Sequence, residues 1–303
     1  MHLFQVGAGS GGIVVLDLVA RDPRVTKVTL VEPDTYKAHN VHRHLFPPAA
    51  VGRSKADLAA EWVRERRPDL TVETLAADLT DATRQAAFAR LASECDVGVC
   101  AVDNEAAKYA FDALMRAAGK PWTLGEVLSG GIGGWVHRFV PGGPCYGCVA
   151  SHLRRNVTDE PAAPAPDYTN PGAAVAETTI PASRASIGTI AGLHAVATLE
   201  LLENLTPQPP SLARKGEQDE ISGPLAPPSF LGKGVGGLGS SDFTSLLLTL
   251  KRVPGVFDDA FKTFRFRVAR AAGCLVCSAD PAPAAGEELD VALDQALARL
   301  GKE

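Results

Sequence analysis

The sequence lacks three features that would each indicate a particular class of protein. It has 30 Lys and Arg against 35 Asp and Glu, a formal net charge of −5, so it carries no basic excess of the kind that nucleic acid requires. No uninterrupted apolar run approaches the roughly 20 residues of a membrane span. The first residues, Met1 to Val6, show neither the basic region nor the cleavage site of a signal peptide. We therefore expect a cytoplasmic protein that binds neither nucleic acid nor membrane.

What is present suits one globular unit with a large core, because 46% of the 303 residues are hydrophobic and 21% are charged. The first 125 residues alternate short apolar runs with helical patterns. This alternation predicts an α/β fold, with a Rossmann-like, largely parallel sheet and helices on both faces. The expected strands are 2–6, 25–31, 70–75 and 96–102, and the expected helices are 11–20, 56–67, 81–92 and 105–118.

The second half of the sequence is less regular. Residues 122–140 combine glycines with apolar residues, which favours hairpins that extend one sheet edge in antiparallel fashion. A further helix is expected over 187–202 and a further strand over 263–268. Residues 207–241 include 13 Pro and Gly among 35, so we expect a disordered insertion. A tail helix is expected within 279–303, and the whole chain, 1–303, is interpreted as a single domain.

A glycine-rich turn joins the first expected strand to the first expected helix. Gly7, Gly9 and Gly12 fit the pattern G-x-G-x-x-G, which lets the backbone approach a phosphate at the amino terminus of a helix. Glu32 follows 20 residues after Gly12, at the end of the second expected strand, where a carboxylate can bind ribose hydroxyls. By itself, this fingerprint indicates NAD or FAD at least as strongly as ATP.

The residues that follow Glu32 favour a triphosphate. Arg43 and Lys55 occur where a dehydrogenase would continue into a helix, and a guanidinium fork and an ammonium charge suit phosphate groups. Asp103 follows the fourth expected strand, at the carboxyl edge where open α/β sheets bind ligands. An aspartate there can also simply cap the next helix. Beside two cations and a glycine turn, we interpret Asp103 as a ligand of Mg²⁺.

Four of the six cysteines form two C-x-x-C pairs, Cys145 with Cys148 and Cys274 with Cys277. Two such pairs match the ligand pattern of a tetrahedral structural Zn²⁺ site. A redox-active pair is the alternative, but neither pair opens a helix after a strand in the first βα unit. Four thiolates leave no open coordination position, so the predicted zinc has a structural role.

With these motifs in this order, the chain resembles the ThiF/MoeB/HesA family of adenylyltransferases, which is related to the ubiquitin-activating enzymes. The resemblance rests on the glycine turn, acid-x-Asp, Asn-x-x-Arg, Val-Gly-x-x-Lys, Asp-Asn and the two cysteine pairs, and leaves out 207–241 and the tail. It implies that Asn40, Arg43 and Lys55 hold and polarise the phosphates of ATP. It also implies that Glu32 binds the ribose and Asp103 binds Mg²⁺.

The resemblance further implies a reaction and a partner. In the family, a carboxylate attacks the α-phosphate of ATP, so that an acyl-adenylate forms and pyrophosphate leaves. The carboxylate is usually the C-terminal glycine of a ubiquitin-like or sulfur-carrier protein, and members are commonly dimers, so a homodimer is expected. Members that go on to a thioester carry a cysteine in the loop before the late helix. Residues 156–186 contain none, so we expect adenylation without a thioester.

Two departures from the family pattern bear on the site. Members commonly have a helix before the first strand whose arginine reaches the phosphates of a neighbouring subunit; here Arg21, Arg24 or a partner protein would have to substitute. His44 stands where the family usually has Gln. We expect it, like His39 and His42, to be solvated or to face the substrate.

Three other interpretations remain open at this point. One is adenylation of another acid, such as a peptide or a modified nucleoside. Another is a catalytically silent scaffold subunit of a heterodimeric activating enzyme. The third, an NAD oxidoreductase, is weakened by the lack of an obvious histidine–acid pair for hydride transfer.

Overall fold

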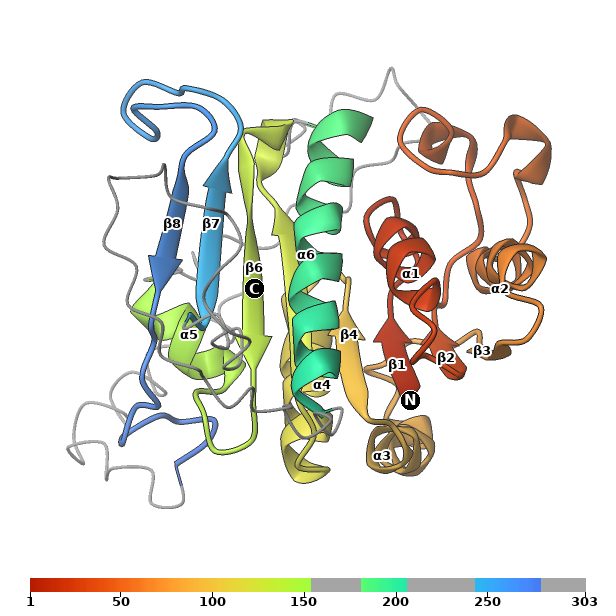
Figure 1. Ribbon diagram of the computed structural model, residues 1–303, viewed down its shortest axis with the longest axis horizontal. Helices are drawn as coiled ribbons and strands as arrows, with labels where there is room; N and C mark the ends of the chain where they lie inside the picture. The colour runs from red at the N-terminus through yellow and green to blue at the C-terminus, as the bar shows by residue number, and fades with distance from the viewer. Residues whose placement is uncertain (154–180, 206–242, 279–303) are drawn as a thin grey trace, which may run out of the picture.

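The structure, a computed structural model, describes residues 1–153, 181–205 and 243–278 and is built around one eight-stranded sheet (Figure 1). The strand order is β3-β2-β1-β4-β5-β6-β7-β8. The strands are β1 (His2–Val6), β2 (Lys27–Val31), β3 (Thr71–Leu75), β4 (Val97–Cys100), β5 (Trp122–Val127), β6 (Gly133–Phe139), β7 (Ser245–Thr249) and β8 (Thr263–Phe266).

The sheet has a parallel half and an antiparallel half. The strands from β3 to β5 pair in parallel, as the alternating pattern of the sequence predicts. β6, β7 and β8 then extend the sheet in antiparallel fashion, which confirms the expected hairpin. The chain runs from β1 outward to β3 and returns to β4 on the other side of β1. The carboxyl ends of β1 and β4 therefore form a topological switch point, where open α/β sheets bind ligands.

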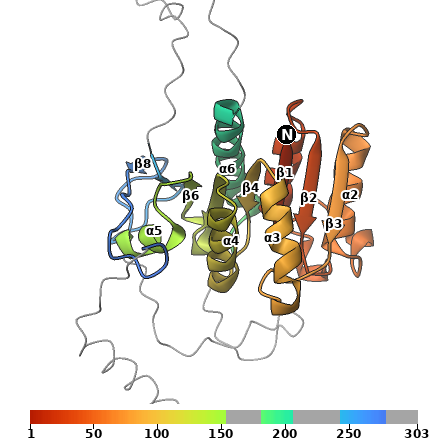
Figure 2. The same cartoon turned by 90° about the horizontal axis from the view of Figure 1, so that it is seen from below.

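Helices cover both faces of the sheet, as the predicted fold class requires, and the view in Figure 2 separates the two layers. One layer holds α1, α2 and α6, of which α1 contacts both others; in the other layer α4 contacts α3 and α5. The α-helices are α1 (Gly12–Ala20), α2 (Lys55–Arg66), α3 (Gln85–Glu94), α4 (Glu105–Ala117), α5 (Tyr146–His152) and α6 (Arg184–Leu205). Short 3-10 helices span Ala38–Asn40, Pro48–Ala50, Ala82–Arg84 and Ser129–Gly131.

Most expected elements lie within a few residues of their predicted bounds, with three differences. Asp81 caps the 3-10 helix that precedes α3, through a bond from the Thr83 N–H to Oδ1 at 2.9 Å, so α3 begins four residues later than predicted. The strand β7 and the helix α5 were not expected. The predicted insertion at 207–241 and the predicted tail helix in 279–303 lie outside the described residues.

The helix α6 is long and apolar enough to cross a membrane, by length and composition alone, and among the described helices it is the one that passes this test. It packs against α1, β5 and β6. Ile190, Ala195 and Leu202 on this helix are all buried in the fold. Burial between the sheet and α1 accounts for its apolar composition.

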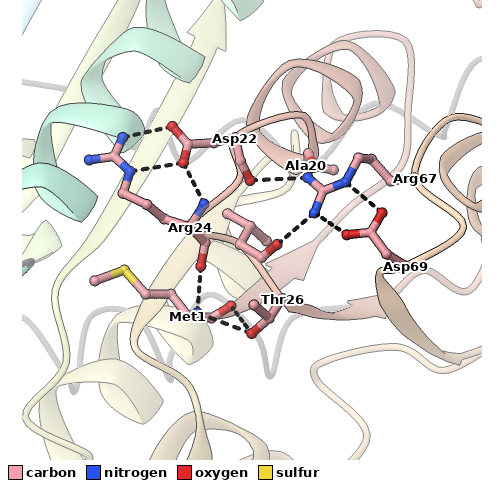
Figure 3. A network of polar contacts seen from close by, with 8 residues as sticks. Met1, Ala20, Asp22, Arg24, Thr26, Arg67 and Asp69 are labelled. Carbon is pink, nitrogen blue, oxygen red and sulfur yellow. Dashed lines mark hydrogen bonds and ion pairs between the residues drawn. The ribbon is translucent and has the colours of Figure 1, made fainter.

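Arg67, the residue just after α2, forms several hydrogen bonds near the amino ends of β1 and β2 (Figure 3). Its guanidinium donates to the backbone oxygen of Ala20 at 2.7 Å, and to those of Asp22 at 3.1 Å and Val25 at 3.2 Å. It also forms a two-point ion pair with Asp69, at 2.9 and 2.8 Å. These bonds hold the turn between α1 and β2 against the end of α2.

Candidate nucleotide site and cysteine cluster

A cavity of about 780 Å³ opens at the carboxyl ends of β1, β4 and β5, that is, at the switch point. All of the nucleotide-binding residues predicted from the sequence line it, although they come from segments up to 96 residues apart. They are Gly7, Gly9, Gly12, Glu32, Asn40, Arg43, Lys55 and Asp103. The structure thus gathers them in one place, which is a precondition for a shared ligand.

The glycine turn needs glycine for two separate reasons. Gly7 has a φ of +93°, and a side chain on it would collide with the carbonyl group of Ala101. A side chain on Gly12 would collide with the carbonyl of Gly7, because α1 starts close against the turn. At Gly9, by contrast, nothing lies within 4 Å of the side-chain position. This open face, at the amino terminus of α1, leaves room for a phosphate group beside backbone N–H groups.

Glu32 at the end of β2 is 5% exposed and is tied to the glycine turn. Its Oε2 accepts a hydrogen bond from the Ala8 N–H at 2.5 Å, and its Oε1 accepts one from the Asp34 N–H at 2.9 Å. Burial raises the pKa of Glu32, although the Ala8 N–H and the Lys55 charge act in the opposite direction. The carboxylate therefore stands at the junction of turn and strand, where the ribose of a bound nucleotide is expected.

Lys55 is the first residue of α2, a helix capped by Ser54. Its Nζ lies 2.7 Å from Oδ2 of Asp34, the second acid of the acid-x-Asp motif, and both residues line the cavity. The lysine is 7% exposed, whereas the Asp34 side chain is 58% exposed. In this arrangement Asp34 holds a buried ammonium group in place at the cavity wall, where phosphate oxygens would be alternative partners for it.

Asn40 and Arg43 belong to the loop that follows β2. The buried Asn40 accepts the Lys37 N–H on its side-chain oxygen at 2.9 Å, and its backbone oxygen accepts the Arg43 N–H at 3.0 Å. Asn40 thereby shapes the turn that places Arg43 in the cavity wall. The geometry gives the asparagine a structural task in addition to the contact with phosphate that the family resemblance implies.

His44 contradicts the expectation that the three neighbouring histidines are solvated or face the substrate. It is buried, and its Nε2 lies 3.0 Å from the carbonyl oxygen of Ala8 in the glycine turn. The ring packs against Tyr36 and Phe46. Burial lowers the pKa of His44 to about 4. His44 therefore supports the glycine turn from inside the fold. The sequence pattern did not reveal this role, because the partner of His44 is a backbone atom 36 positions away.

Asp103 is not the residue that caps helix α4. Asn104 is the N-cap of α4, where its side chain accepts the Ala107 N–H at 2.7 Å. Asp103, one residue earlier, is exposed and lines the cavity. Capping therefore does not account for Asp103, and an exposed carboxylate in the same cavity as the glycine turn has the chemistry that Mg²⁺ prefers.

Arg21 and Arg24 were suggested above as substitutes for an arginine from a neighbouring subunit. Both lie near the amino ends of the parallel strands, whereas the cavity of the same chain opens at the carboxyl ends. Arg24 forms an ion pair with Asp22 at 2.7 Å (Figure 3). Arg21 forms one with Asp17 at 2.8 Å. Neither arginine contributes to the cavity within its own chain.

The four cysteines of the two C-x-x-C pairs form a cluster, with all four sulfur atoms within 4.8 Å of one another. Cys145 lies 3.7 Å from Cys148 and 3.6 Å from Cys274, and Cys148 lies 3.6 Å from Cys277. Tetrahedral Zn²⁺ with bonds of about 2.3 Å would place its sulfur ligands about 3.8 Å apart. The four residues therefore fit zinc.

Local structure favours loss of at least one thiol proton in this cluster. Burial would raise the pKa of Cys274, but the N–H groups of Val276 and Cys277 help to bring it down to about 7. Burial raises the pKa of Cys145 and of Cys148. Binding of a metal ion would release the remaining thiol protons, because the cysteine ligands of zinc are thiolates.

An open α/β sheet with a glycine turn at its switch point is typical of nucleotide-binding proteins. Within that class, the model described as the ThiF family matches residues 1–220. The chain therefore belongs to the ThiF family. This confirms the resemblance inferred from the motifs.

Two curated relatives give the family context. The ubiquitin-like modifier-activating enzyme 5 of Oryza sativa subsp. japonica is 26% identical over 165 residues, which are 51% of this chain and 39% of that protein. The SAMP-activating enzyme E1 of Haloferax volcanii is 30% identical over 145 residues, 48% of this chain and 51% of that protein. The chain thus spans about half the length of these relatives or less.

Among solved structures, the fold is similar to that of E. coli MccB. The MccB structure with ATP has a TM-score of 0.60 and 16% sequence identity, and the match covers 91% of this chain and 66% of that chain. A second MccB structure, with AMPCPP and selenomethionine MccA, has the same TM-score. At this level of identity, the likeness shows the fold.

Proposed function

We propose that the protein is an ATP-dependent adenylyltransferase that activates the C-terminal carboxylate of a ubiquitin-like or sulfur-carrier protein. One observation carries the proposal: the eight nucleotide-binding residues predicted from the sequence line a single cavity at the switch point. The ThiF family match and the names of the two curated relatives support the type of substrate. We also propose that the protein is a homodimer, as family members commonly are.

In the proposed reaction, an oxygen of the substrate carboxylate attacks the α-phosphorus of ATP, and the bond from that phosphorus to the bridging oxygen of pyrophosphate breaks. Glu32 would hold the ribose, and the open face at Gly9 would admit the phosphates. Arg43 and Lys55 would neutralise the charge that grows on the leaving pyrophosphate. No proton transfer is needed, because the attacking group is already an anion.

Asp103 would hold the Mg²⁺ that accompanies ATP, and a bound Mg²⁺ supplies further charge neutralisation along the phosphates. The exposed carboxylate at the cavity wall fits this task. Lys55 moves between partners in this scheme, from Asp34 to a phosphate oxygen. We propose that the reaction stops at the adenylate, since residues 156–186 contain no cysteine. Residues 154–180 of that loop lie outside the described residues.

A second candidate function is adenylation of a peptide. MccB structures, which share the fold, include one with the N-formylated peptide MccA. In that case the substrate would be a short chain rather than a folded ubiquitin-like protein.

ATP–pyrophosphate exchange tests the proposal. We expect exchange to require a small protein or peptide with a free C-terminal carboxylate, and Asp103→Asn to lower its rate about 100-fold or more. Asp258→Asn removes an exposed carboxylate that does not line the cavity and serves as the matched control. Full exchange by Asp103→Asn would contradict its assignment. Failure of the wild-type protein to bind ATP would contradict the proposed function itself.

A further inference from the structure

Lys37, in the loop that follows β2, lines the cavity beside the predicted nucleotide residues. The chain is held in place on both sides of it. Tyr36, the residue before it, is fully buried, and the Tyr36 hydroxyl donates to the backbone oxygen of Phe46 at 2.7 Å. On the other side, the side-chain oxygen of Asn40 accepts the Lys37 N–H at 2.9 Å. The backbone of Lys37 therefore has a defined place in the cavity wall.

The local backbone also determines which way the Lys37 side chain points. Lys37 is extended, with φ −110° and ψ 158°. Successive side chains of an extended chain point to opposite sides. Because the side chain of Tyr36 points into the core, that of Lys37 points away from the core, and it is exposed. Its exposed side chain is therefore accessible to a ligand in the cavity.

Lys37 differs from the two other lysines of the cavity in having no acidic partner. Lys55 forms an ion pair with Asp34 at 2.7 Å. Lys108 of α4 forms one with Glu126 of β5 at 2.6 Å. In the part of the chain that the structure describes, no carboxylate forms an ion pair with Lys37. Its charge is therefore not offset before a ligand binds.

The surroundings of His39 show which part of ATP lies near Lys37. Burial lowers the pKa of this half-buried ring, and three cations lower it further, namely Arg43, Lys37 and Lys55. All three are therefore close enough to act on one ring, and all three line the cavity. Like charges gathered in this way repel one another, and a bound anion relieves the repulsion. The proposed reaction places the pyrophosphate part of ATP beside Arg43 and Lys55, and so on the same side as Lys37.

A lysine without a partner is ordinary on an open surface, where water solvates its charge. Lys37 is not in that situation, because it lies in a cavity wall together with other cations. The local fold does not require its ammonium group either. The turn that follows uses only the backbone N–H of Lys37, which any residue other than proline would supply.

We propose that the ammonium group of Lys37 binds the pyrophosphate part of ATP, and that this contact makes the cavity favour ATP over AMP. An ammonium group is a compact point charge that suits a phosphate oxygen. The inference rests on the proposed function and adds a binding residue to that site. Lys37 lies between two of the motifs, acid-x-Asp and Asn-x-x-Arg, and belongs to neither.

Isothermal titration calorimetry with ATP, AMP and pyrophosphate tests the inference without a known partner protein. Lys37→Met removes the charge but keeps a long unbranched side chain and the backbone N–H. We expect this variant to bind ATP and pyrophosphate about tenfold or more weakly than the wild-type protein does. Its Kd for AMP should be unchanged, because AMP lacks the part that Lys37 contacts. Lys37→Arg keeps a positive charge and should retain most of the affinity for ATP.

Lys120→Met is the matched control. Lys120 precedes β5, at the amino ends of the parallel strands, and does not line the nucleotide cavity. It too lacks an ion pair in the described part of the chain, so its substitution changes the net charge by the same amount. The control variant should bind all three ligands as the wild-type protein does. Thermal unfolding of each variant shows that it is folded.

The outcomes distinguish this inference from the proposed function. An unchanged Kd for ATP in Lys37→Met would overturn the role of Lys37 and leave adenylation standing. The role is also overturned if AMP binding weakens as much as ATP binding, because Lys37 then contacts another part of the nucleotide. An equal loss in Lys120→Met would show an effect of net charge alone and would overturn it as well. If the wild-type protein binds neither ATP nor AMP, the proposed function fails, and the inference fails with it.

Discussion

The His44 ring beside the glycine turn is neutral near pH 7, because burial disfavours its charged form. Nε2 must carry the hydrogen that it donates to the Ala8 carbonyl, so Nδ1 is the atom that a second proton would reach. Among the described residues, the buried Nδ1 has no hydrogen-bond partner. Burial, followed by the charges of Lys55 and Arg184, lowers the pKa of His44 to about 4. An unfolded chain binds this proton near pH 6.5, so the unfolded state gains protons first as the pH falls.

The pH dependence of stability follows with a definite sign. Between pH 6.5 and about 4, His44 should make the free energy of unfolding decrease as the pH is lowered, by about 2 to 3 kcal/mol in total. His44→Gln carries an amide N–H for the same carbonyl but has no group that titrates. We expect urea unfolding of this variant at pH 7 and pH 4.5 to show a correspondingly smaller difference than the wild-type protein.

The exposed His42 supplies the control for this prediction. His42→Gln should retain the pH dependence of the wild-type protein. Should His44→Gln and the wild-type protein lose the same stability between the two pH values, the ring is not the group that titrates.

The residues of the site differ in how far the sequence alone could predict them. Arg43, Lys55 and Asp103 belong to ordered motifs, and the cavity confirms that they lie together. Lys108 and Glu126 carry no motif, and their contact joins a helix to a strand 18 positions further along the chain. Such a pair forms only after the sheet has placed α4 against β5. Its members therefore look like ordinary surface charges in the sequence.

The helix α6 lies so close to β5 and β6 that glycine is required between them. A side chain on Gly125 of β5 would come within 2.5 Å of Nδ1 of His194 on α6, a buried residue that also bonds Thr123. The backbone of Gly125 has no positive φ, so the obstacle is the approach of the helix alone. We expect Gly125→Ala to lower the free energy of unfolding by about 1 to 3 kcal/mol, because α6 must move outward.

Gly192, inside α6, supplies a control substitution for which we expect a gain in stability instead of a loss. Nothing lies within 4 Å of its side-chain position. Gly192→Ala should therefore raise the free energy of unfolding by about 0.5 to 1 kcal/mol, through the helix propensity of alanine. Thermal and urea unfolding of the two variants measure both changes. A Gly125→Ala variant as stable as the wild-type protein would show that α6 is free to shift.

Prediction of the elements succeeded where a pattern repeats over enough residues. The parallel strands and the first helices each combine an apolar run with a clear beginning or end, such as Pro68 after α2. The strand β7 was missed because its apolar run is short and shows no alternation, and burial on both faces is what removes the alternation. The helix α5 was missed because its seven residues begin at a cysteine pair, which indicated metal binding instead.

At the scale of the whole molecule, the cysteine cluster joins the two halves of the sheet. Tyr146, between Cys145 and Cys148, donates its backbone N–H to Asp112 at 3.0 Å and its hydroxyl to Glu105 at 2.7 Å. Both acids belong to α4, which packs beside the parallel strands. The second cysteine pair follows β8, the outermost strand. A metal ion in the cluster would therefore fasten the end of the antiparallel half to the helix that flanks the cavity.

Zinc should accordingly stabilise the protein without being needed for the core to form. The two cysteine pairs have 125 residues between them in the sequence, and the strands of the parallel half lie outside that interval. A ligand present at about 1,000 times its Kd stabilises a fold by about 4 kcal/mol. For a domain of this size, that corresponds to a Tm about 10 °C higher. We expect one zinc ion per chain in the purified protein, and a fall in Tm of this order after removal by a chelator.

Cys274→Ser should reproduce the effect of the chelator, because three thiolates bind the ion much more weakly than four. Cys95→Ser is the matched control. Its thiol is buried elsewhere and bonds the backbone oxygen of Ala92, so the variant should keep its zinc even where it loses some stability. Elemental analysis by mass spectrometry, combined with thermal unfolding, separates the two variants. The prediction would be contradicted if Cys274→Ser kept a full complement of zinc. It would also be contradicted if a chelator left the Tm of the wild-type protein unchanged.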